Sequence, residues 1–199
     1  MATIGIKGFW VANYAEAATG STGYVYSAGK KIAKAVQADT SYTIAEQAFY
    51  ADNGKDDEVR AVTGVDVTLT PNDVNIDWEN ELGLASETIT INGDEVSIKG
   101  LKSSTEGGFR GLAFIENVRE SGTEKCAVRI FPKVKFHMAD SKSVVTKGES
   151  ITFNTQTIVA TGFADTEGNF ELYPTERFAS EAAATAYIAN LFNVSGIGG

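Results

Sequence analysis

Most of the chain alternates apolar and polar residues with a period of two, which is typical of strands that cover a core with one face. Residues 65–70 read Val-Asp-Val-Thr-Leu-Thr, with the apolar side chains on one side. Residues 151–159 alternate similarly, and we place Val159 on the apolar face and Ile158 on the polar one. In residues 126–136 the even positions are predicted to face a core and the odd ones to form a basic face. The even face carries Val128, Ile130, Val134 and Phe136, and the odd face carries Arg129, Phe131, Lys133, Lys135 and then His137.

The turn signals between these strands predict one hairpin and several loops. Asn92-Gly93 predicts a type I′ hairpin turn, because both residues readily take positive φ angles. The flanking strands are expected at residues 87–91 and 95–99. Polar, glycine-containing stretches gain little from burial and are predicted as exposed loops at residues 17–23, 51–59 and 101–108.

Two stretches depart from the β pattern. Ser180 is a plausible N-cap for a helix whose stripe consists of Ala184, Tyr187, Ile188 and Leu191. Residues 71–82 also fit a helix, with Pro71 at its start and Gly83 as its stop. A strand through Asp77 is the competing interpretation of that stretch, since its apolar residues also alternate; we favour the helix.

These elements predict a mainly β protein, a β-sandwich with flanking α-helices. We expect a single domain over residues 1–194, because no linker or shift in composition divides the chain. Residues 195–199 are predicted to form a flexible, glycine-rich C-terminal tail.

Charge and cysteine content narrow the function classes. With 26 acidic and 17 basic residues the net charge is -9, which disfavours binding to phosphate backbones. Lys30, Lys31 and Lys34 form the densest basic cluster, and we interpret it as a subunit contact or a solvated face. No apolar run is long enough for a membrane span, and residues 1–10 do not resemble a secretion signal. Cys126 is the sole cysteine, so no intrachain disulfide is expected.

Candidate catalytic and metal-binding residues are few. His137 is the only histidine, and we interpret it as a solvated strand residue rather than a catalytic base. Cys126 lies in the apolar phase of its strand and is expected to be buried. The acidic clusters at 52–58 and 165–167 do not match a calcium loop; we expect a solvated loop and a hairpin turn around Gly168 instead. We therefore expect a protein that is not an enzyme and has no cofactor or metal.

A series of short blocks follows along nearly the whole chain, and their order and spacing carry more information than any one of them. The blocks are Ala2–Gly8, Ala33–Ala38, Tyr50–Gly54, Val65–Leu69, Pro71–Gly83, Gly111–Ile115, Lys133–Phe136, Gln156–Ile158 and Ala183–Phe192. In this respect the chain resembles the major tail protein (tail tube protein) family of long-tailed, siphovirus-type phages and prophages of Gram-positive bacteria. The hairpin at residues 86–99 departs from that family's pattern.

The resemblance implies a tail-tube-like fold and a structural function in the virion tail, with assembly in the host cytoplasm. It implies self-assembly into stacked, commonly hexameric rings whose sheets join into one β-barrel, through which DNA passes without specific binding. It also implies a tape-measure protein, a tail terminator and tail-tip proteins as partners. Six copies at -9 would carry 6 × -9 = -54 charges per ring, and an acidic lumen would repel DNA. The pattern leaves open which strand face lines the passage.

General physics agrees with ring formation, because closing a ring between copies pairs the exposed sheet edges of each subunit without open-ended aggregation. Within that framework we assign the loop at residues 46–62 as the ring-to-ring contact, since it is a polar arm with two adjacent aromatic residues. A flexible surface loop is the alternative interpretation. The candidate contact residues are Phe49, Tyr50, Asp52, Asn53, Asp56, Asp57 and Glu58.

Two other function classes stay open at this point. A monomeric β-sandwich binding module, for carbohydrate or surface recognition, should expose a cluster of aromatic residues, but the tyrosines and tryptophans are scattered along the chain. An enzyme should show a paired catalytic constellation, which the single histidine and single cysteine do not supply.

Overall fold

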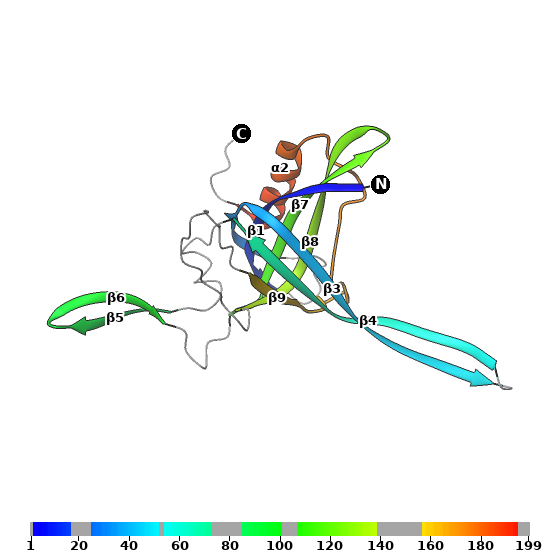
Figure 1. Ribbon diagram of the computed structural model, residues 1–199, viewed down its shortest axis with the longest axis horizontal. Helices are drawn as coiled ribbons and strands as arrows, with labels where there is room; N and C mark the ends of the chain where they lie inside the picture. Colours follow the sequence, from blue (N-terminus) through cyan, green and yellow to red (C-terminus); the bar gives the residue numbers. More distant parts are fainter. Residues whose placement is uncertain are drawn as a thin grey trace, which may run out of the picture.

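The computed structural model describes residues 2–16, 25–51, 54–72, 85–100, 107–138 and 157–194, and within them the protein is mainly β (Figure 1). Seven strands form one antiparallel sheet in the order β2-β1-β7-β8-β9-β4-β3, and β5 and β6 form a separate hairpin. The elements are β1 (Ala2–Ala15), β2 (Val25–Ala33), β3 (Ala35–Ala51), β4 (Gly54–Pro71), β5 (Ala85–Ile91), β6 (Asp94–Gly100), β7 (Arg110–Glu120), β8 (Thr123–Met138), β9 (Ile158–Gly162) and α2 (Glu181–Phe192).

The large sheet curls so that its two halves face each other across a first core. Phe9, Leu112 and Phe114 reach this core from β1 and β7, and Val67 and Leu69 reach it from β4. β1 also contacts β3, although four strands separate them in the sheet order. The predicted alternation over residues 65–70 is confirmed, because all three of its apolar side chains are fully buried.

A second core lies on the outer side of the half formed by β2, β1, β7 and the first part of β8, where α2 covers the sheet. The predicted helix is confirmed: the Ser180 side chain accepts a hydrogen bond from the backbone N–H of Ala183, as an N-cap does. Its buried face consists of Ala184, Ile188 and Phe192. Tyr187, which the predicted stripe included, stays 37% exposed.

The expectation that one face of β8 covers one core is wrong. Cys126, Val128 and Ile130 pack in the second core, but Phe131 and Val134 pack in the first. The cause is a register shift: the partner of Leu112 is Phe131, whereas the partner of Arg110 is Val134, so β8 carries an extra residue here. A β-bulge reverses the alternation, and one strand therefore serves both cores.

Two further expectations are corrected. The described residues of the predicted loop at 51–59, Ala51 and residues 54–59, lie in strands: β3 and β4 pair, with register shifts, out to Ala51 and Gly54. In β9 the buried positions are 158, 160 and 162, so Ile158 faces the core and Val159 does not. Small residues cause this error, because Ala160 and Gly162 occupy the core face and their size gives a weak hydrophobic signal. A Cβ at Gly162 would lie 2.3 Å from a methyl carbon of Val65.

The Asn92-Gly93 hairpin is confirmed, with φ angles of 54° and 93° at the two turn residues. The turn at Gly168 is also present, but no paired strands flank it. The helix predicted for residues 71–82 does not begin at Pro71, which is the last residue of β4 and pairs with Ala35. Residues 73–82, over which the helix and strand interpretations compete, lie outside the described residues, as do the predicted loop at 17–23, most of the one at 101–108 and the tail at 195–199.

Candidate functional site

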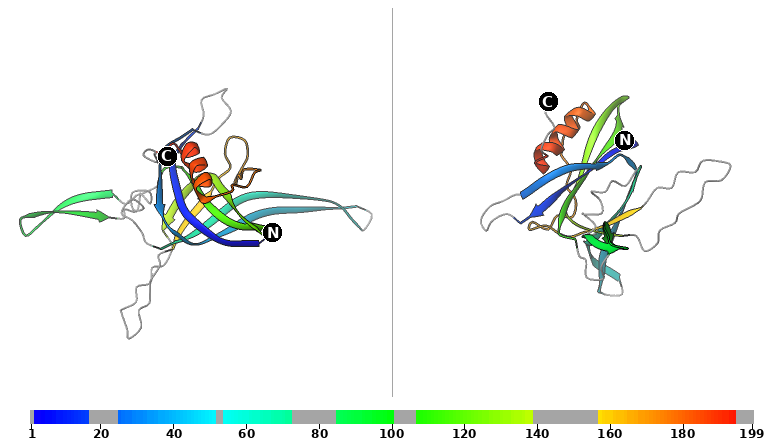
Figure 2. Two further views of the ribbon diagram at one scale, coloured as in Figure 1. Left: turned by 90° about the horizontal axis from the view of Figure 1, so that it is seen from above. Right: turned by 90° about the vertical axis from the view of Figure 1, so that its left-hand side faces the viewer.

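The largest exposed feature of the described chain is an arm, which we define as residues 44–51 of β3 paired with residues 54–62 of β4. The arm extends beyond the body of the protein (Figures 1 and 2). Its apolar residues are uncovered: Ile44 is 49%, Val62 45% and Val59 65% exposed. A two-stranded ribbon is marginally stable by itself in water, so an arm with these exposed apolar side chains gains stability from a partner surface.

The residues predicted from sequence to form the contact gather near the end of this arm. Phe49 and Tyr50 lie in β3 and pair with Asp57 and Lys55 of β4. Asp56 lies between these two β4 positions, and Glu58 follows, opposite Ala48. Asp52 and Asn53 lie outside the described residues.

The charges along the arm form a small surface network. The Arg60 guanidinium lies 3.3 Å from a carboxylate oxygen of Glu46 and 3.8 Å from one of Glu58. A hydrogen bond with the neighbouring Glu58 carboxyl raises the pKa of Glu46. These groups are largely exposed, so the network adds little stability by itself and leaves the charges accessible to a partner.

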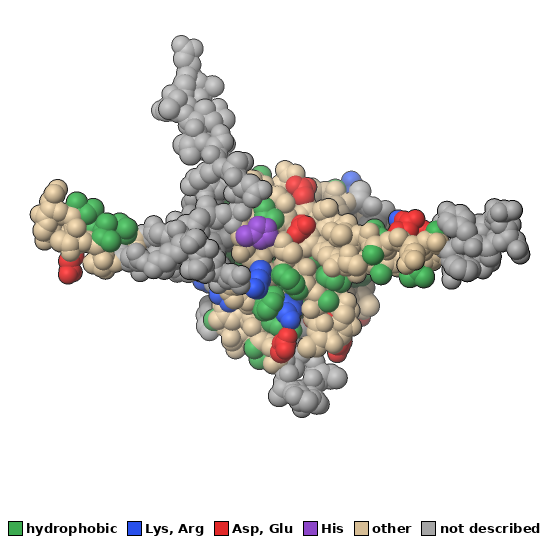
Figure 3. All heavy atoms as spheres, turned by 90° about the horizontal axis from the view of Figure 1, so that it is seen from below, with side chains coloured by type: hydrophobic (Ala, Val, Ile, Leu, Met, Phe, Trp, Pro, Cys, Tyr) green, Lys and Arg blue, Asp and Glu red, His purple; other side chains and the backbone are tan. Residues whose placement is uncertain are grey.

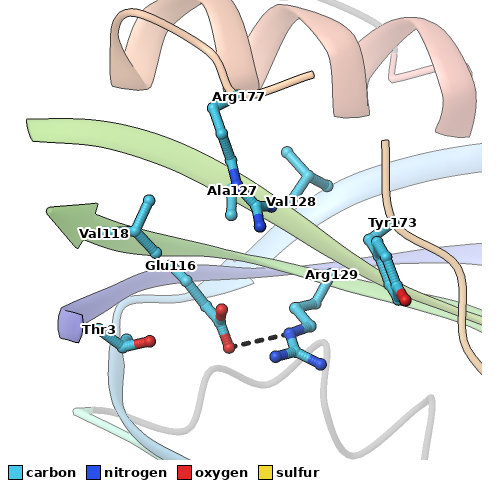
Figure 4. A pocket seen from close by; sticks show the side chains of 8 residues that line it. All are labelled: Thr3, Glu116, Val118, Ala127, Val128, Arg129, Tyr173 and Arg177. Carbon is cyan, nitrogen blue, oxygen red and sulfur yellow. Dashed lines mark hydrogen bonds and ion pairs between the residues drawn. The ribbon is translucent and has the colours of Figure 1, made fainter. Parts of the chain in front are cut away.

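A second cluster joins the base of the arm to the body. The Tyr42 hydroxyl donates a hydrogen bond to Glu171, and the Arg129 guanidinium donates another to the same residue. Arg129 also donates a hydrogen bond of 3.0 Å to Glu116 (Figure 4). Burial and the hydrogen bond to Glu171 raise the pKa of Tyr42 to about 12. We call Tyr42, Glu116, Arg129 and Glu171 the brace.

The brace borders a hollow of about 270 Å³ that is also lined by Thr3, Tyr173 and Arg177 (Figure 4). Both carboxylates of the brace already neutralise Arg129. The cluster is therefore suited to holding the base of β3 against β7 and β8. Sequence analysis missed it, because its members come from distant segments and no local pattern joins them.

The two edge strands of the sheet differ in how well they resist pairing with another chain. β2 is irregular: Ala28 has a φ of 52°, the pairing with β1 shifts register twice, and Lys30 and Lys31 lie on the strand. Bulges and lysines are the usual protection of an edge. β3 is 17 residues long and contains no Lys, Arg, Pro or Gly. Its pairing with β4 also shifts register, at three places, so β3 differs from β2 in lacking lysines and not in being regular. By that criterion β3 is the less protected of the two edges of the described sheet.

Among the residues that the structure describes, nothing covers one face of the sheet, and this face is mainly polar. It belongs to β3, β4, β9 and the end of β8, whose opposite face packs on the first core. The Thr161 hydroxyl donates a hydrogen bond of 2.7 Å to the Asp66 carboxylate across this face. Figure 3 shows basic and apolar side chains next to each other around the histidine. By register and burial the face carries Gln37, Asp39, Ser41, Asp66, Thr68, Lys133, Lys135, His137, Val159, Thr161 and Phe163.

The residues examined as candidates for catalysis lie apart from one another. His137 is exposed, as expected, and Cys126 is buried in the second core, where burial raises the pKa of its thiol. Within the described ranges no three His, Cys, Asp or Glu side chains are placed to hold a metal ion. Among the same residues, none of the helical stretches has the length and apolar character that crossing a membrane requires.

Comparison with known proteins adds no relative, since no family model and no curated protein matches the chain.

Proposed function

We propose that the protein is a structural, self-assembling subunit of the tail-tube class, in which copies join edge to edge into rings around a passage and the rings stack. The observation that carries this proposal is the β3 edge, because a long strand without lysine or proline is a template for pairing with another chain. The β2 edge carries two lysines, so the two edges of the molecule differ and the contact has a direction.

In the proposal, the β3 edge of one copy joins the sheet of the next copy. Such a head-to-tail contact generates a ring when the rotation between copies closes, and a helical filament when it does not.

The uncovered polar face is the candidate wall of the passage, since the other faces of the sheet pack on the two cores. A wall rich in threonine and serine hydroxyls has little to hold a passing polymer. Asp39 and Asp66 balance Lys133 and Lys135 on this face, so the proposed acidity of the lumen depends on the net charge of -9 per copy. DNA passes without specific binding in this proposal.

The arm is the proposed ring-to-ring contact, because its apolar residues are exposed and its end carries the predicted aromatic and acidic residues. The function is structural rather than catalytic. A tape-measure protein, a tail terminator and tail-tip proteins are proposed partners in a virion tail assembled in the host cytoplasm, and they come from the resemblance alone.

The test follows the mass and shape of the purified chain as its concentration rises, by light scattering and electron microscopy. We expect the native chain to form rings or tubes, and Ser41→Lys with Thr43→Lys on β3 to stay at the monomer mass of 21.2 kDa. Ser27→Lys on the already protected β2 edge is the matched control and should assemble like the native chain. A native chain that stays monomeric throughout would contradict the proposal and favour a binding module.

A further inference from the structure

The β5–β6 hairpin has an apolar face that nothing covers in the described structure. Ile89 pairs with Val96, and Ile91 and Ile98 share their face, whereas Thr88 and Ser97 lie on the other. Ile91 is 47% and Val96 37% exposed. Within the described residues β5 and β6 pack mainly on each other, and the hairpin projects from the body (Figure 2). An isolated two-stranded hairpin is marginally stable and gains from a surface to pack against.

The tip of this hairpin is acidic as well as apolar. Asp94 is paired with Ile91 and so shares the apolar face, whereas Glu95 is paired with Thr90 and lies on the opposite face. Both carboxylates are exposed. The apolar face of the tip therefore presents exposed Ile and Val side chains beside the Asp94 carboxylate, and a matching surface would be apolar or aromatic with a cation at its border.

The body carries such a surface, which we call the basic–aromatic patch and define as Phe109, Lys133, Lys135 and Phe163. The Phe109 and Phe163 rings meet edge to face with centroids 5.4 Å apart. The ammonium groups of Lys133 and Lys135 lie 4.6 and 4.9 Å from the centre of the Phe109 ring. Phe163 is 39% exposed, whereas the Lys133 side chain is 15% exposed and pairs with Glu16. The patch therefore combines an exposed ring with two cations that lie over an aromatic side chain.

We propose that the tip of the β5–β6 hairpin docks on the basic–aromatic patch of a second copy of the chain, with Ile91 and Val96 against the rings and Asp94 beside the lysines, while Glu95 lies at the outer side of the tip. The inference rests on the proposed self-assembly. Charge complementarity selects the patch, and each copy supplies one hairpin and one patch, so the contact runs head to tail.

The position of the patch agrees with this role. It lies where β9 ends at Gly162 and β7 begins at Arg110, at one end of the uncovered face. A hairpin that docks there leaves the middle of that face, around Thr68 and Thr161, free to line the passage.

Reciprocal charge reversal tests the contact. The hairpin variant is Asp94→Lys with Glu95→Lys, and the patch variant is Lys133→Glu with Lys135→Glu. Each variant alone should self-associate about tenfold more weakly at low ionic strength, by sedimentation and light scattering. An equimolar mixture should recover the native mass distribution, because each reversed tip then meets a reversed patch. Matched controls are Glu124→Lys and Arg119→Glu at the far β7–β8 turn, which should leave association unchanged.

Lys133 also pairs with Glu16 at 2.9 Å, so Lys133→Glu removes an ion pair within the subunit and could lower its stability. A second variant therefore tests the patch without changing Lys133. Phe163→Ser changes a partly exposed ring and should weaken association without lowering the thermal midpoint. If native chains assemble and the reversed variants match them, the inference fails while the proposed function stands. If native association returns when one chain carries both reversals but does not return in the mixture, the hairpin docks on the patch of its own chain. That result would overturn the contact with a second copy. A monomeric native chain overturns both proposals.

Discussion

Removal of the Arg129 guanidinium gives the sharpest test of the brace. Arg129→Met keeps most of the packing of the side chain but leaves Glu116 and Glu171 without their shared cation. Those carboxylates are only 16% and 11% exposed, so their charges are poorly solvated. Breaking a buried ion pair costs about 3–5 kcal/mol. Because Arg129 itself is 37% exposed, solvent screens part of the loss, and we expect about 2 kcal/mol.

The assay is urea unfolding followed by far-UV circular dichroism, in a double-mutant cycle with Glu171→Gln. A loss of about 2 kcal/mol corresponds to a fall of about 4–8 °C in the thermal midpoint for a chain of this length. The double variant should lose less than the sum of the single variants, because removing both partners leaves fewer uncompensated charges. A loss below about 0.5 kcal/mol for Arg129→Met, or strict additivity, would refute the argument that the brace holds the base of the arm.

Three other outcomes follow from single features of the fold. The pKa of Tyr42 is raised from 10 to about 12 in the folded state, so the folded protein binds this proton more tightly than the unfolded chain does. The free energy of unfolding should therefore fall as the pH rises from 10 to 12. Urea midpoints measured over this range should fall less steeply for Tyr42→Phe. Gly29→Ala should destabilise by about 2 kcal/mol, since its Cβ would lie 2.3 Å from the carbonyl oxygen of Phe192, whereas Gly5→Ala, with open space around its Cβ, should be nearly neutral in the same assay. Deleting residues 53–57 should leave a folded subunit that forms no long tubes in electron micrographs; long tubes from that variant would rule out the arm as the ring-to-ring contact.

The candidate surfaces were predictable in part. The aromatic and acidic run around Tyr50 and Asp56 is visible in the sequence, and the structure places its backbone in the projecting arm. The secondary structure of this segment was not predicted, because its glycine and charged residues suggested a loop, whereas β3 and β4 are paired as far as Ala51 and Gly54. Polar residues are compatible with a loop and with a two-stranded ribbon, and only the pairing of the two strands decides between these structures.

The brace had no signal in the sequence at all. Tyr42 and Glu171 are separated by 129 positions. Each residue by itself resembles an ordinary polar strand or loop residue. Their association depends on how the sheet curls, which no local pattern describes.

The sequence by itself determined the features that depend on near neighbours: the alternation in residues 65–70, the Asn92-Gly93 turn and the capped helix after Ser180. Alternation, turn angles and capping are properties of a few consecutive residues. The tertiary structure alone decided which core each side of β8 faces, which edge of the sheet stays open and which face stays uncovered. A bulge of one residue moves each later side chain of the strand to the opposite face of the sheet. The edges and faces of a sheet are defined only once distant strands have paired.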